Sequence, residues 1–226
     1  MAPFGASRAG LMSVADDDIP DSVLRQRWDE GSGDTVEDED GDNDGNIEGA
    51  SWHADGDLEG GYGLSFDGSD AVVADAMSEL GSDGDYLLCI TIDADSSSGD
   101  QTFTQQYSGD TVDLSIGYRD GHIGVRNDHN DDSGRRIEDG ETTDRIRVGV
   151  YCDNDSDEIR IYKQGSREDD SDGTEPSSAA DSGLVFGART DQANGLDGIG
   201  DHPVIYDEPE DPDDAAQADY NDQPWS

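Results

Sequence analysis

The sequence has very little positive charge. It contains 57 aspartate and glutamate residues against 13 lysine and arginine residues, and Lys163 is the one lysine, so the formal net charge is −44. Phosphate groups would be repelled by this charge, and no basic stripe is present that could release the counterions of a nucleic acid. We therefore exclude nucleic acids and anionic lipid surfaces as direct partners.

Long apolar runs and cysteine motifs are also missing. No apolar stretch approaches the length of about 18 residues that a transmembrane helix needs, so we expect no membrane insertion. Residues 1–15 lack the apolar centre of a secretory signal. The two cysteines, Cys89 and Cys152, form no C-x-x-C motif, which leaves zinc and redox chemistry without support. We expect both to be small buried residues, with a disulfide between neighbouring strands as the alternative.

Large aliphatic and phenyl side chains are few. Leu, Ile, Val and Phe total 37 of the 226 residues, a share typical of disordered chains when the net charge is this high. These residues nevertheless recur in short alternating runs bounded by Gly, Asp, Asn and Ser, as half-buried strands require. One face of residues 145–152, for example, consists of Ile146, Val148, Val150 and Cys152. The pattern predicts a folded β protein.

Aspartate, in contrast, is abundant and supplies 44 of the 57 acidic residues. At ordinary ionic strength the Debye length is about 8 Å and the like charges repel strongly, whereas at molar salt it falls to about 3 Å. Short carboxylates also bind water and hydrated cations, while lysine stems would expose apolar surface. We infer a protein of a halophilic cell or of something that lives on one.

Residues 1–15 interrupt this acidity, because they contain no acidic residue and a single arginine. A flexible tail is the common interpretation of such a terminus. We instead expect this Gly-rich, weakly apolar segment to dock into another protein. The predicted domains are a docking arm with its connector, residues 1–23, and one sandwich domain with an acidic C-terminal segment, residues 24–226. The predicted docking residues are Phe4, Arg8, Leu11, Met12 and Val14.

Strands are predicted about every 8 to 15 residues with no long helix between them, which is typical of an antiparallel β sandwich. Residues 47–52 are interpreted as one strand and residues 74–80 as a short helix or turn. A helical turn is expected at residues 215–220. The other predicted strands are residues 24–28, 63–66, 72–73, 86–92, 101–107, 112–118, 122–126, 145–151, 158–162, 183–187 and 203–206.

Several blocks of the sequence follow one another in an order that is typical of one family of β domains. The early blocks are R-W-D-E-G-S-G-D-T-V-E-D from Arg27, G-D-N-D-G-N-I-E-G-A-S-W ending at Trp52, and G-Y-G-L-S-F-D-G-S-D-A-V-V from Gly61. The later ones are R-I-R-V-G-V-Y, R-I-Y-K-Q-G, L-V-F-G-A-R and I-Y-D-E-P. In this order the blocks resemble a laminin-G-like, concanavalin-A-like jelly-roll domain, and the resemblance covers about residues 24–220. It implies an all-β, antiparallel jelly-roll sandwich, and loops at one rim that commonly bind glycans or proteins.

The stretch G-A-S-R-A-G-L, residues 5–11, resembles leaders on minor structural proteins of tailed viruses that infect haloarchaea. It implies a non-enzymatic virion component that docks on other virion proteins and adheres to a glycan or S-layer glycoprotein of the host. We expect a homo-oligomer within the assembly and an extracellular, high-salt location. The alternatives are a cell-surface carbohydrate-binding module of a haloarchaeon and, less favoured, a glycoside hydrolase of the same fold.

The sequence contains no convincing catalytic constellation. Glycosidases need two carboxyl groups at a fixed separation across the scissile bond. The acidic residues 138–141 form a predicted turn, and Pro209 interrupts residues 208–211, so neither group alternates within an apolar strand. No G-x-S-x-G elbow is present, and the four histidines show no H-x-x-x-H pairing. We expect no enzymatic activity.

An acidic loop offers a candidate metal site. Asp40, Asp42 and Asp44 alternate in D-G-D-N-D-G as in the first half of a calcium loop, and Glu48 occupies the next ligand position. Ser51 stands where a bidentate glutamate would close the cage. The competing interpretation is a hairpin turn with added acidic residues. Calcium or another cation therefore stays a candidate ligand, and the acidic turn at residues 153–157 is a weaker candidate of the same kind.

Aromatic and basic residues give weaker hints. Trp28 and Trp52 lie within strand blocks, and we expect both in the core. Several tyrosines could stack on sugars, but nothing in the sequence gathers them on one rim. The arginines between residues 119 and 136 are close in sequence, and we expect them to form ion pairs with the many acidic residues rather than a ligand site.

Overall fold

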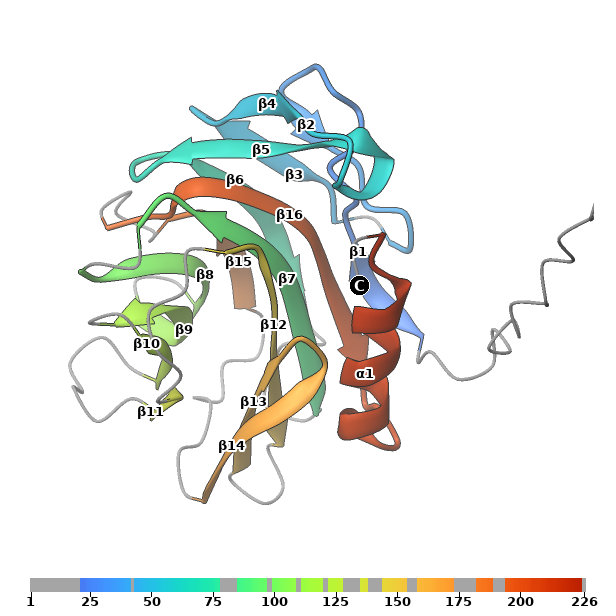
Figure 1. Cartoon of the computed structure of the whole chain (residues 1–226), viewed down its shortest axis with the longest axis vertical. Helices are drawn as coiled ribbons and strands as arrows, with labels where there is room; N and C mark the ends of the chain where they lie inside the picture. The colour runs from blue at the N-terminus through green and yellow to red at the C-terminus, as the bar shows by residue number, and fades with distance from the viewer. Residues whose placement is uncertain are drawn as a thin grey trace, which may run out of the picture.

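The chain folds as a β sandwich in which two antiparallel sheets lie face to face (Figure 1). The structure is a computed structural model, and it describes residues 21–41, 43–77, 85–96, 99–108, 111–119, 122–127, 135–137, 144–153, 158–172, 182–188 and 194–224. Within these ranges there is a single α-helix, and no helix is long and apolar enough to cross a membrane. The predicted all-β antiparallel sandwich is confirmed.

The first sheet contains eight strands. Its central strand β16 (Asp197–Asp207) is long and has a register shift between Asp201 and Val204. One edge of β16 pairs first with β5 (Tyr62–Asp67) and then with β1 (Ser22–Arg25). The order along the sheet is β14 (Ser166–Asp172), β13 (Glu158–Lys163), β12 (Ile146–Asp153), β7 (Tyr86–Ala94), β16 (Asp197–Asp207), β5 (Tyr62–Asp67) and β4 (Ser51–Ala54), with β1 (Ser22–Arg25) beside β16.

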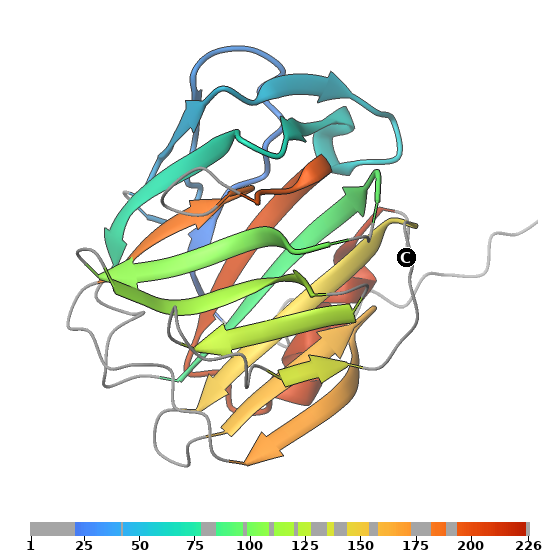
Figure 2. The same cartoon turned by 90° about the vertical axis from the view of Figure 1, so that its left-hand side faces the viewer.

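The second sheet also contains eight strands and faces the viewer in Figure 2. Three of its strands form a meander, because β8 (Gln101–Ser108), β9 (Thr111–Arg119) and β10 (His122–Asn127) pair with each other in sequence order. The order along the sheet is β11 (Arg135–Ile137), β10 (His122–Asn127), β9 (Thr111–Arg119), β8 (Gln101–Ser108), β15 (Ser182–Phe186), β6 (Ala71–Met77), β3 (Gly45–Glu48) and β2 (Thr35–Val36).

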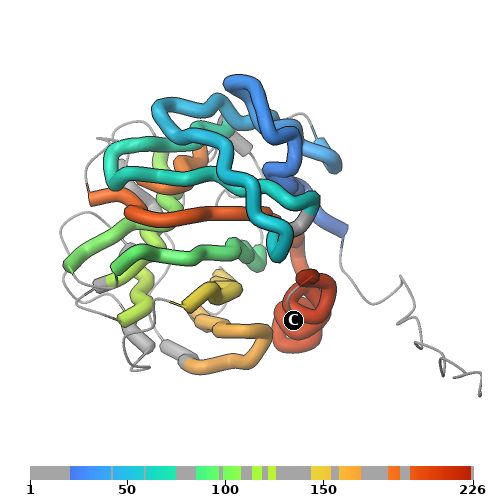
Figure 3. The backbone as a smooth tube through the Cα atoms, turned by 45° about the horizontal axis from the view of Figure 1, so that its top comes forward, coloured from blue at the N-terminus to red at the C-terminus, as the bar shows by residue number. Residues whose placement is uncertain are grey.

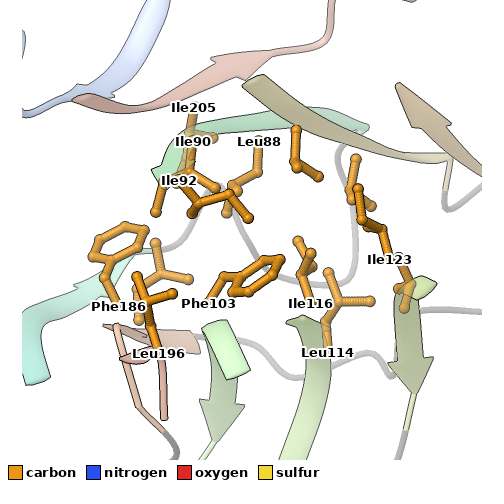
Figure 4. Close-up of a cluster of buried hydrophobic side chains, with 14 of the residues drawn as sticks. Leu88, Ile90, Ile92, Phe103, Leu114, Ile116, Ile123, Phe186, Leu196 and Ile205 are labelled. Atoms are coloured by element: carbon orange, nitrogen blue, oxygen red, sulfur yellow. The ribbon is translucent and has the colours of Figure 1, made fainter. Parts of the chain in front are cut away.

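The core lies between the two sheets. Along β7, Leu88, Ile90 and Ile92 point inward and meet Phe103, Leu114 and Ile116 of the second sheet (Figure 4). This alternation is the two-residue period that the sequence pattern predicted. Each such side chain contributes about 1.5–3 kcal/mol on full burial, so a small set of apolar residues suffices when nearly all of it is buried.

Three aromatic rings close one end of the core. Trp28 is fully buried, and its ring centroid lies 5.9 Å from those of both Phe66 and Phe186. Gly187 has a φ of +81°, and a Cβ there would lie 2.1 Å from the ring of Phe66. Only glycine therefore fits at this position, which allows the chain to leave β15 against the aromatic cluster.

The outer face of the first sheet is covered by the helix α1 (Pro212–Asp222), which lies beside the sheet in Figure 3. Outward-facing Leu87, Cys89 and Val204 pack against Ala215 and Ala216 of this helix. The helix begins at Asp211, whose carboxylate accepts hydrogen bonds from the backbone N–H groups of residues 213 and 214. The predicted helical turn at residues 215–220 is confirmed and extends further in both directions.

Two sequence predictions are wrong. Residues 47–52 are not one strand, because the chain turns at Gly49 and places β3 in the second sheet and β4 in the first. Residues 74–77 are not helical but continue β6, which pairs with both β15 and β3. Tertiary pairing outweighs the weak helical preference of A-D-A-M in this stretch.

The two cysteines are free thiols and lie on opposite faces of the first sheet. Cys152 belongs to the core between the sheets, whereas Cys89 lies under α1. Burial raises the pKa of Cys152 to about 12 and that of Cys89 well above its ordinary value. The expectation of two buried, unpaired cysteines is confirmed.

Candidate ligand-binding site

The predicted docking arm lies outside the described residues. Phe4, Arg8, Leu11, Met12 and Val14 all precede Asp21, where the description of the chain begins. The arm therefore stays a prediction of the sequence. The described sandwich starts with β1 at Ser22, two residues before the predicted domain boundary at residue 24.

The described residues of the predicted calcium site lie in three different surroundings. Asp40 pairs with Arg25 at 3.1 Å and accepts a hydrogen bond from the Ser22 hydroxyl. Asp44 accepts a hydrogen bond from a backbone N–H, and Glu48 is exposed at the end of β3. Asp42 lies outside the described residues. Among the residues that the structure describes, no three His, Cys, Asp or Glu side chains converge as a metal site would require.

Asp38, which the sequence analysis did not single out, organises this acidic loop. Its carboxylate accepts hydrogen bonds from the backbone N–H groups of Arg25 at 2.9 Å and of Asp40 and Asn43 at 3.2 Å. The N–H group of Asp38 in turn donates to the Asp44 carboxylate at 2.9 Å. Carboxylates of this loop thus bind backbone donors, as the hairpin-turn interpretation expects. The sequence feature that could have identified Asp38 is the D-E-D run of residues 38–40, directly before the loop.

A second group of charged residues meets at the end of the sandwich. The Nη2 atom of Arg145 lies 2.6 Å from the Asp55 carboxylate and 3.3 Å from that of Asp93. We call these three residues the rim cluster. They come from the β4–β5 connection, the end of β7 and the start of β12, which are far apart in the sequence. Their side chains are 24%, 35% and 15% exposed for Asp55, Asp93 and Arg145, so a ligand can reach them.

The rim cluster continues as a row of residues across the first sheet. The register pairs Asp93 with Ile199, Ile199 with Ser65, and Ser65 with Ser51, while Arg145 directly precedes the pair of Ile146 with Ile92. Neighbouring strands are about 4.8 Å apart, so the row from β12 to β4 extends over about 19 Å. None of these residues packs into the central core, because inward and outward positions alternate along each strand.

A tight loop holds Asp55 over this face. The backbone N–H of Asp55 donates to the Gly61 carbonyl at 3.0 Å, and that of Gly61 donates to the Leu58 carbonyl at 3.1 Å. Leu58 is buried against Gly63 and Ile199, and a Cβ on Gly63 would lie 2.7 Å from the Leu58 side chain. The absence of a side chain at Gly63 thus lets the loop lie across the sheet and carry Asp55 to Arg145.

The electrostatics of the rim cluster favour ionisation of Asp55. The pKa of Asp55 is lowered first by a hydrogen bond from the backbone N–H of Asp57 and then by Arg145, with a smaller contribution from His53. Asp93 acts on the neighbouring core, because its negative charge adds to burial in raising the pKa of Tyr118 to about 12. The cluster therefore presents two negative groups around one guanidinium.

This arrangement suits hydrogen bonding to hydroxyl groups. Guanidinium groups only donate and ionised carboxylates only accept, whereas a hydroxyl does both. The mutual pairing of Arg145 and Asp55 also fixes both side chains before a ligand arrives, which reduces the entropic cost of binding. Sequence analysis missed the cluster, because Asp55, Asp93 and Arg145 carry no shared motif and are brought together only by the strand pairing.

Another charged pair lies beneath α1 and is closed to ligands. Arg147 and Asp219 have side chains that are 2% and 1% exposed, and they form a bidentate pair with N–O distances of 2.7 and 2.8 Å. The Tyr206 hydroxyl donates a further hydrogen bond to Asp219 at 2.8 Å. This pair joins the helix to the sheet and is not a candidate for substrate binding.

The aromatic residues are mostly structural. Trp28 is in the core as predicted, and Trp52 is partly buried against it, with its indole N–H donating to the Gly33 carbonyl at 2.9 Å. Tyr118 and Tyr151 are buried. Among the described residues Tyr62, which is 37% exposed and follows the Asp55 loop, is the one large apolar side chain on the surface. The sequence analysis did not select it.

Comparison with known proteins shows the fold but no family. No protein-family model matches the sequence, and no curated protein matches it. Trypanosoma rangeli sialidase in complex with 2,3-difluorosialic acid superposes with a TM-score of 0.66 at 14% identity, over 88% of this chain and 32% of that chain. The chain thus spans about a third of the length of the sialidase.

A second similar structure is a single domain. Domain 4 of AbnA, a GH43 extracellular arabinanase from Geobacillus stearothermophilus, in complex with arabinotriose, has a TM-score of 0.67 at 14% identity. The match covers 88% of this chain and 100% of that domain. An HCR/D mutant matches with a TM-score of 0.65 at 13% identity, over 92% of this chain and 53% of that chain. At these identities the similarity shows a shared β-sandwich fold.

Proposed function

We propose that the chain is a non-catalytic glycan-binding domain that serves adhesion on the virus particle of a halophilic archaeal virus. The rim cluster is the observation that carries the glycan-binding part. It is a fixed set of donors and acceptors at a partly exposed end of a sandwich whose fold also occurs in the AbnA domain complexed with arabinotriose. The row of residues that leads from it across the first sheet is long enough for several linked sugar units.

The proposed binding mode uses both charges of the rim cluster. Arg145 donates to sugar oxygens, and Asp55 and Asp93 accept from sugar hydroxyls. His53 is exposed next to this loop and offers a further polar contact, while Ile199 supplies an apolar surface for a sugar ring. Binding through such pre-arranged polar groups is weak for each contact and specific in its geometry.

Calorimetry in molar potassium chloride tests this site. The probe is a set of glycans released from haloarchaeal S-layer glycoprotein, titrated into the wild type, Arg145→Gln and the control Arg27→Gln. Arg27 pairs with Glu39 in an exposed position and is not one of the three residues of the rim cluster. We expect Arg145→Gln to weaken binding roughly tenfold or more, because hydrogen bonds from a charged donor are lost. The control should bind as the wild type does.

Two outcomes would contradict the glycan proposal in different ways. Equal binding by the wild type and Arg145→Gln, with unchanged melting temperatures, would place the site elsewhere on the domain. Failure of the wild type to bind any of these glycans would exclude the adhesion function itself. Release of new reducing ends during incubation would instead favour the glycoside hydrolase alternative.

The location on a virion is supported by the sequence of the arm alone. Residues 1–15 are free of acidic residues and resemble leaders of virion proteins. A chain lacking residues 2–15 should fold and bind glycan as the full chain does, but it should not enter particles when it replaces the full chain in infected cells. Incorporation of the shortened chain at the normal level would refute the docking role. A cell-envelope location with no copies in particles would favour the cell-surface module.

A further inference from the structure

The helix α1 is attached to the sandwich by an apolar patch and by polar side-chain contacts around it. Its buried residues Ala215 and Ala216 pack on an apolar part of the first sheet. Three polar contacts surround this patch. Asp219 forms the bidentate pair with Arg147, Asp213 accepts a hydrogen bond from the Tyr162 hydroxyl at 2.6 Å, and the Gln223 side-chain carbonyl accepts one from the Thr91 hydroxyl of β7 at 3.5 Å.

Arg147 gives this interface its specificity. Besides Asp219, its Nη1 atom donates to the Thr91 hydroxyl at 3.2 Å and to the His202 carbonyl at 2.5 Å. The guanidinium is therefore held by β7, β12 and β16 in one orientation, ready for a carboxylate from outside the sheet. A buried cation without that carboxylate is strongly unfavourable, so the sheet requires an Asp219 group in this place.

The helix α1 is not stable in water when it is detached from the sheet. It has 11 residues, and four of them, at positions 213, 214, 219 and 222, are aspartates. No basic residue lies in its last turn, where the helix dipole would favour one. Isolated helices of this length are marginal in water even with favourable sequences. The helix and the first sheet therefore each need the other, but nothing in their contacts requires both to belong to the same molecule.

The segment that connects β16 to α1 is short and strained. It consists of residues 208–211, and Glu208 has a φ of +39°. A positive φ is unfavourable for a residue with a side chain, and the next residue, Pro209, further restricts Glu208 toward extended conformations. The N–H of Glu208 donates to the Asp85 carbonyl at 2.7 Å, which helps to hold this bend. An extended connection would release the strain and move α1 away from its own sheet.

We propose that α1 exchanges between two copies of the chain, so that each α1 lies on the first sheet of the other copy. Every contact of α1 is retained in such a symmetric dimer, and the two connecting segments become extended. Four extended residues span at most about 14 Å, so the two sandwiches lie close together at the ends of their β16 strands. The proposal concerns assembly and does not depend on glycan binding.

Analytical ultracentrifugation in molar potassium chloride tests the role of the strained connection. Glycine tolerates a positive φ, so Glu208→Gly should stabilise the bent connection and weaken the dimer roughly tenfold or more for each of the two connections. Asn194→Gly is the matched control, because Asn194 also has a positive φ, of +52°, but lies in an exposed loop before β16. The control should leave the dimer constant unchanged.

A complementation experiment tests whether α1 is the exchanged element. Arg147→Asp and Asp219→Arg each place like charges in the interface, so neither variant should dock α1 alone. When they are mixed, each helix meets an opposite charge on the other chain, and native mass spectrometry should detect a one-to-one heterodimer. A chain carrying both substitutions should regain docking by itself, which shows whether the reversed pair fits.

Several results would overturn the exchange. A wild type that stays monomeric after refolding at high concentration would do so, as would equal dimer constants for the wild type and Glu208→Gly. Monomers in the mixture, with docked helix in the doubly substituted chain, would show that docking is strictly intramolecular. If the reversed pair does not fit, a variant that lacks residues 208 and 209 provides the test. Its connecting segment is too short for α1 to reach its own sheet, so the chain should dock α1 only as a dimer. A monomer with an undocked helix would refute the proposal.

Discussion

At the scale of single residues, Arg147 connects the helix to the sandwich. A fully buried arginine is rare because its desolvation is costly. It is tolerated here because three groups accept its hydrogen bonds: the Asp219 carboxylate, the Thr91 hydroxyl and the His202 carbonyl. Removal of one partner would leave the other charge buried and unpaired. The pair therefore specifies where α1 docks more than it stabilises the fold.

We expect Asp219→Asn to lower the free energy of unfolding by about 3 to 5 kcal/mol, since it leaves the Arg147 charge buried without its counter-charge. Urea denaturation at fixed molar salt measures this loss. Glu39→Gln serves as the control, because the Glu39 pair with Arg27 is exposed on both sides and should change the free energy of unfolding by less than about 0.5 kcal/mol. Similar effects of the two substitutions would contradict the importance of burial.

The contribution of the Asp219 carboxylate to the free energy of unfolding should depend on pH. Burial opposes ionisation of Asp219, but the charge of Arg147 and the hydrogen bonds from Arg147 and Tyr206 outweigh it, so its pKa lies below the ordinary value of 3.8. Because the folded pKa is the lower one, the stabilisation is complete above about pH 5 and disappears as pH falls through the folded pKa.

The difference in unfolding free energy between the wild type and Asp219→Asn should therefore shrink between pH 6 and pH 3. Comparison of the two proteins at each pH removes the contribution of the other acidic residues, which both share. A difference that stays constant over this range would show that Asp219 is not ionised in the folded protein, against the direction of the pKa shift.

Residue-level prediction from the sequence succeeded where one side chain dominates its surroundings. Trp28 and the two cysteines are buried as their apolar neighbours in the sequence indicate. It did not identify Arg145, because its partners Asp93 and Asp55 lie 52 and 90 positions away in the chain. A lone aspartate or arginine among so many charged residues carries no local signal of such a partner.

At the scale of elements, strands with alternating apolar residues were predictable and acidic edge strands were not. The strand β14 has the sequence S-R-E-D-D-S-D and forms only through its pairing with β13. Its charges suit the edge of a sheet, where they oppose the addition of further strands. The division of residues 45–54 into two strands of different sheets was also hidden, since Gly49 is a single turn residue within an otherwise continuous pattern.

The cap of α1 gives a prediction at this scale. Asp211→Ala should destabilise the protein by about 1 kcal/mol, because the N–H groups of residues 213 and 214 lose their acceptor. Asp222→Ala is the matched control at the other end of the helix, where a negative charge opposes the helix dipole. It should leave the melting temperature unchanged or raise it slightly. Equal losses for the two variants in thermal unfolding would contradict a capping role.

At the scale of the whole molecule, we expect the net charge of −44 to make folding depend on salt concentration. We expect the chain to lose its β structure on dialysis into low salt. The Debye length then increases, so the carboxylates repel each other more strongly and over longer distances. Far-ultraviolet circular dichroism should show the loss, and return of molar potassium chloride should restore the spectrum. An unchanged spectrum in low salt would refute the halophilic interpretation.

The overall architecture was predictable because it follows from the spacing of short strands and the lack of long helices. The order of strands within the sheets was not predictable, because pairs such as β16 with β7 join residues about 110 positions apart, and the sequence pattern records only which face of a strand is apolar. The same limit applies to the rim cluster. Its three residues occupy one end of the sandwich only because β12, β7 and the Asp55 loop meet there.

The placement of the two cysteines has a consequence for where the protein can operate. Cys89 and Cys152 are separated by the sheet to which both belong, so they cannot form a bond with each other without disrupting it. The sandwich therefore needs no covalent link and should keep the same stability with or without a thiol reductant. A chain of this design needs no change in its covalent bonds to fold in a reducing or in an oxidising compartment.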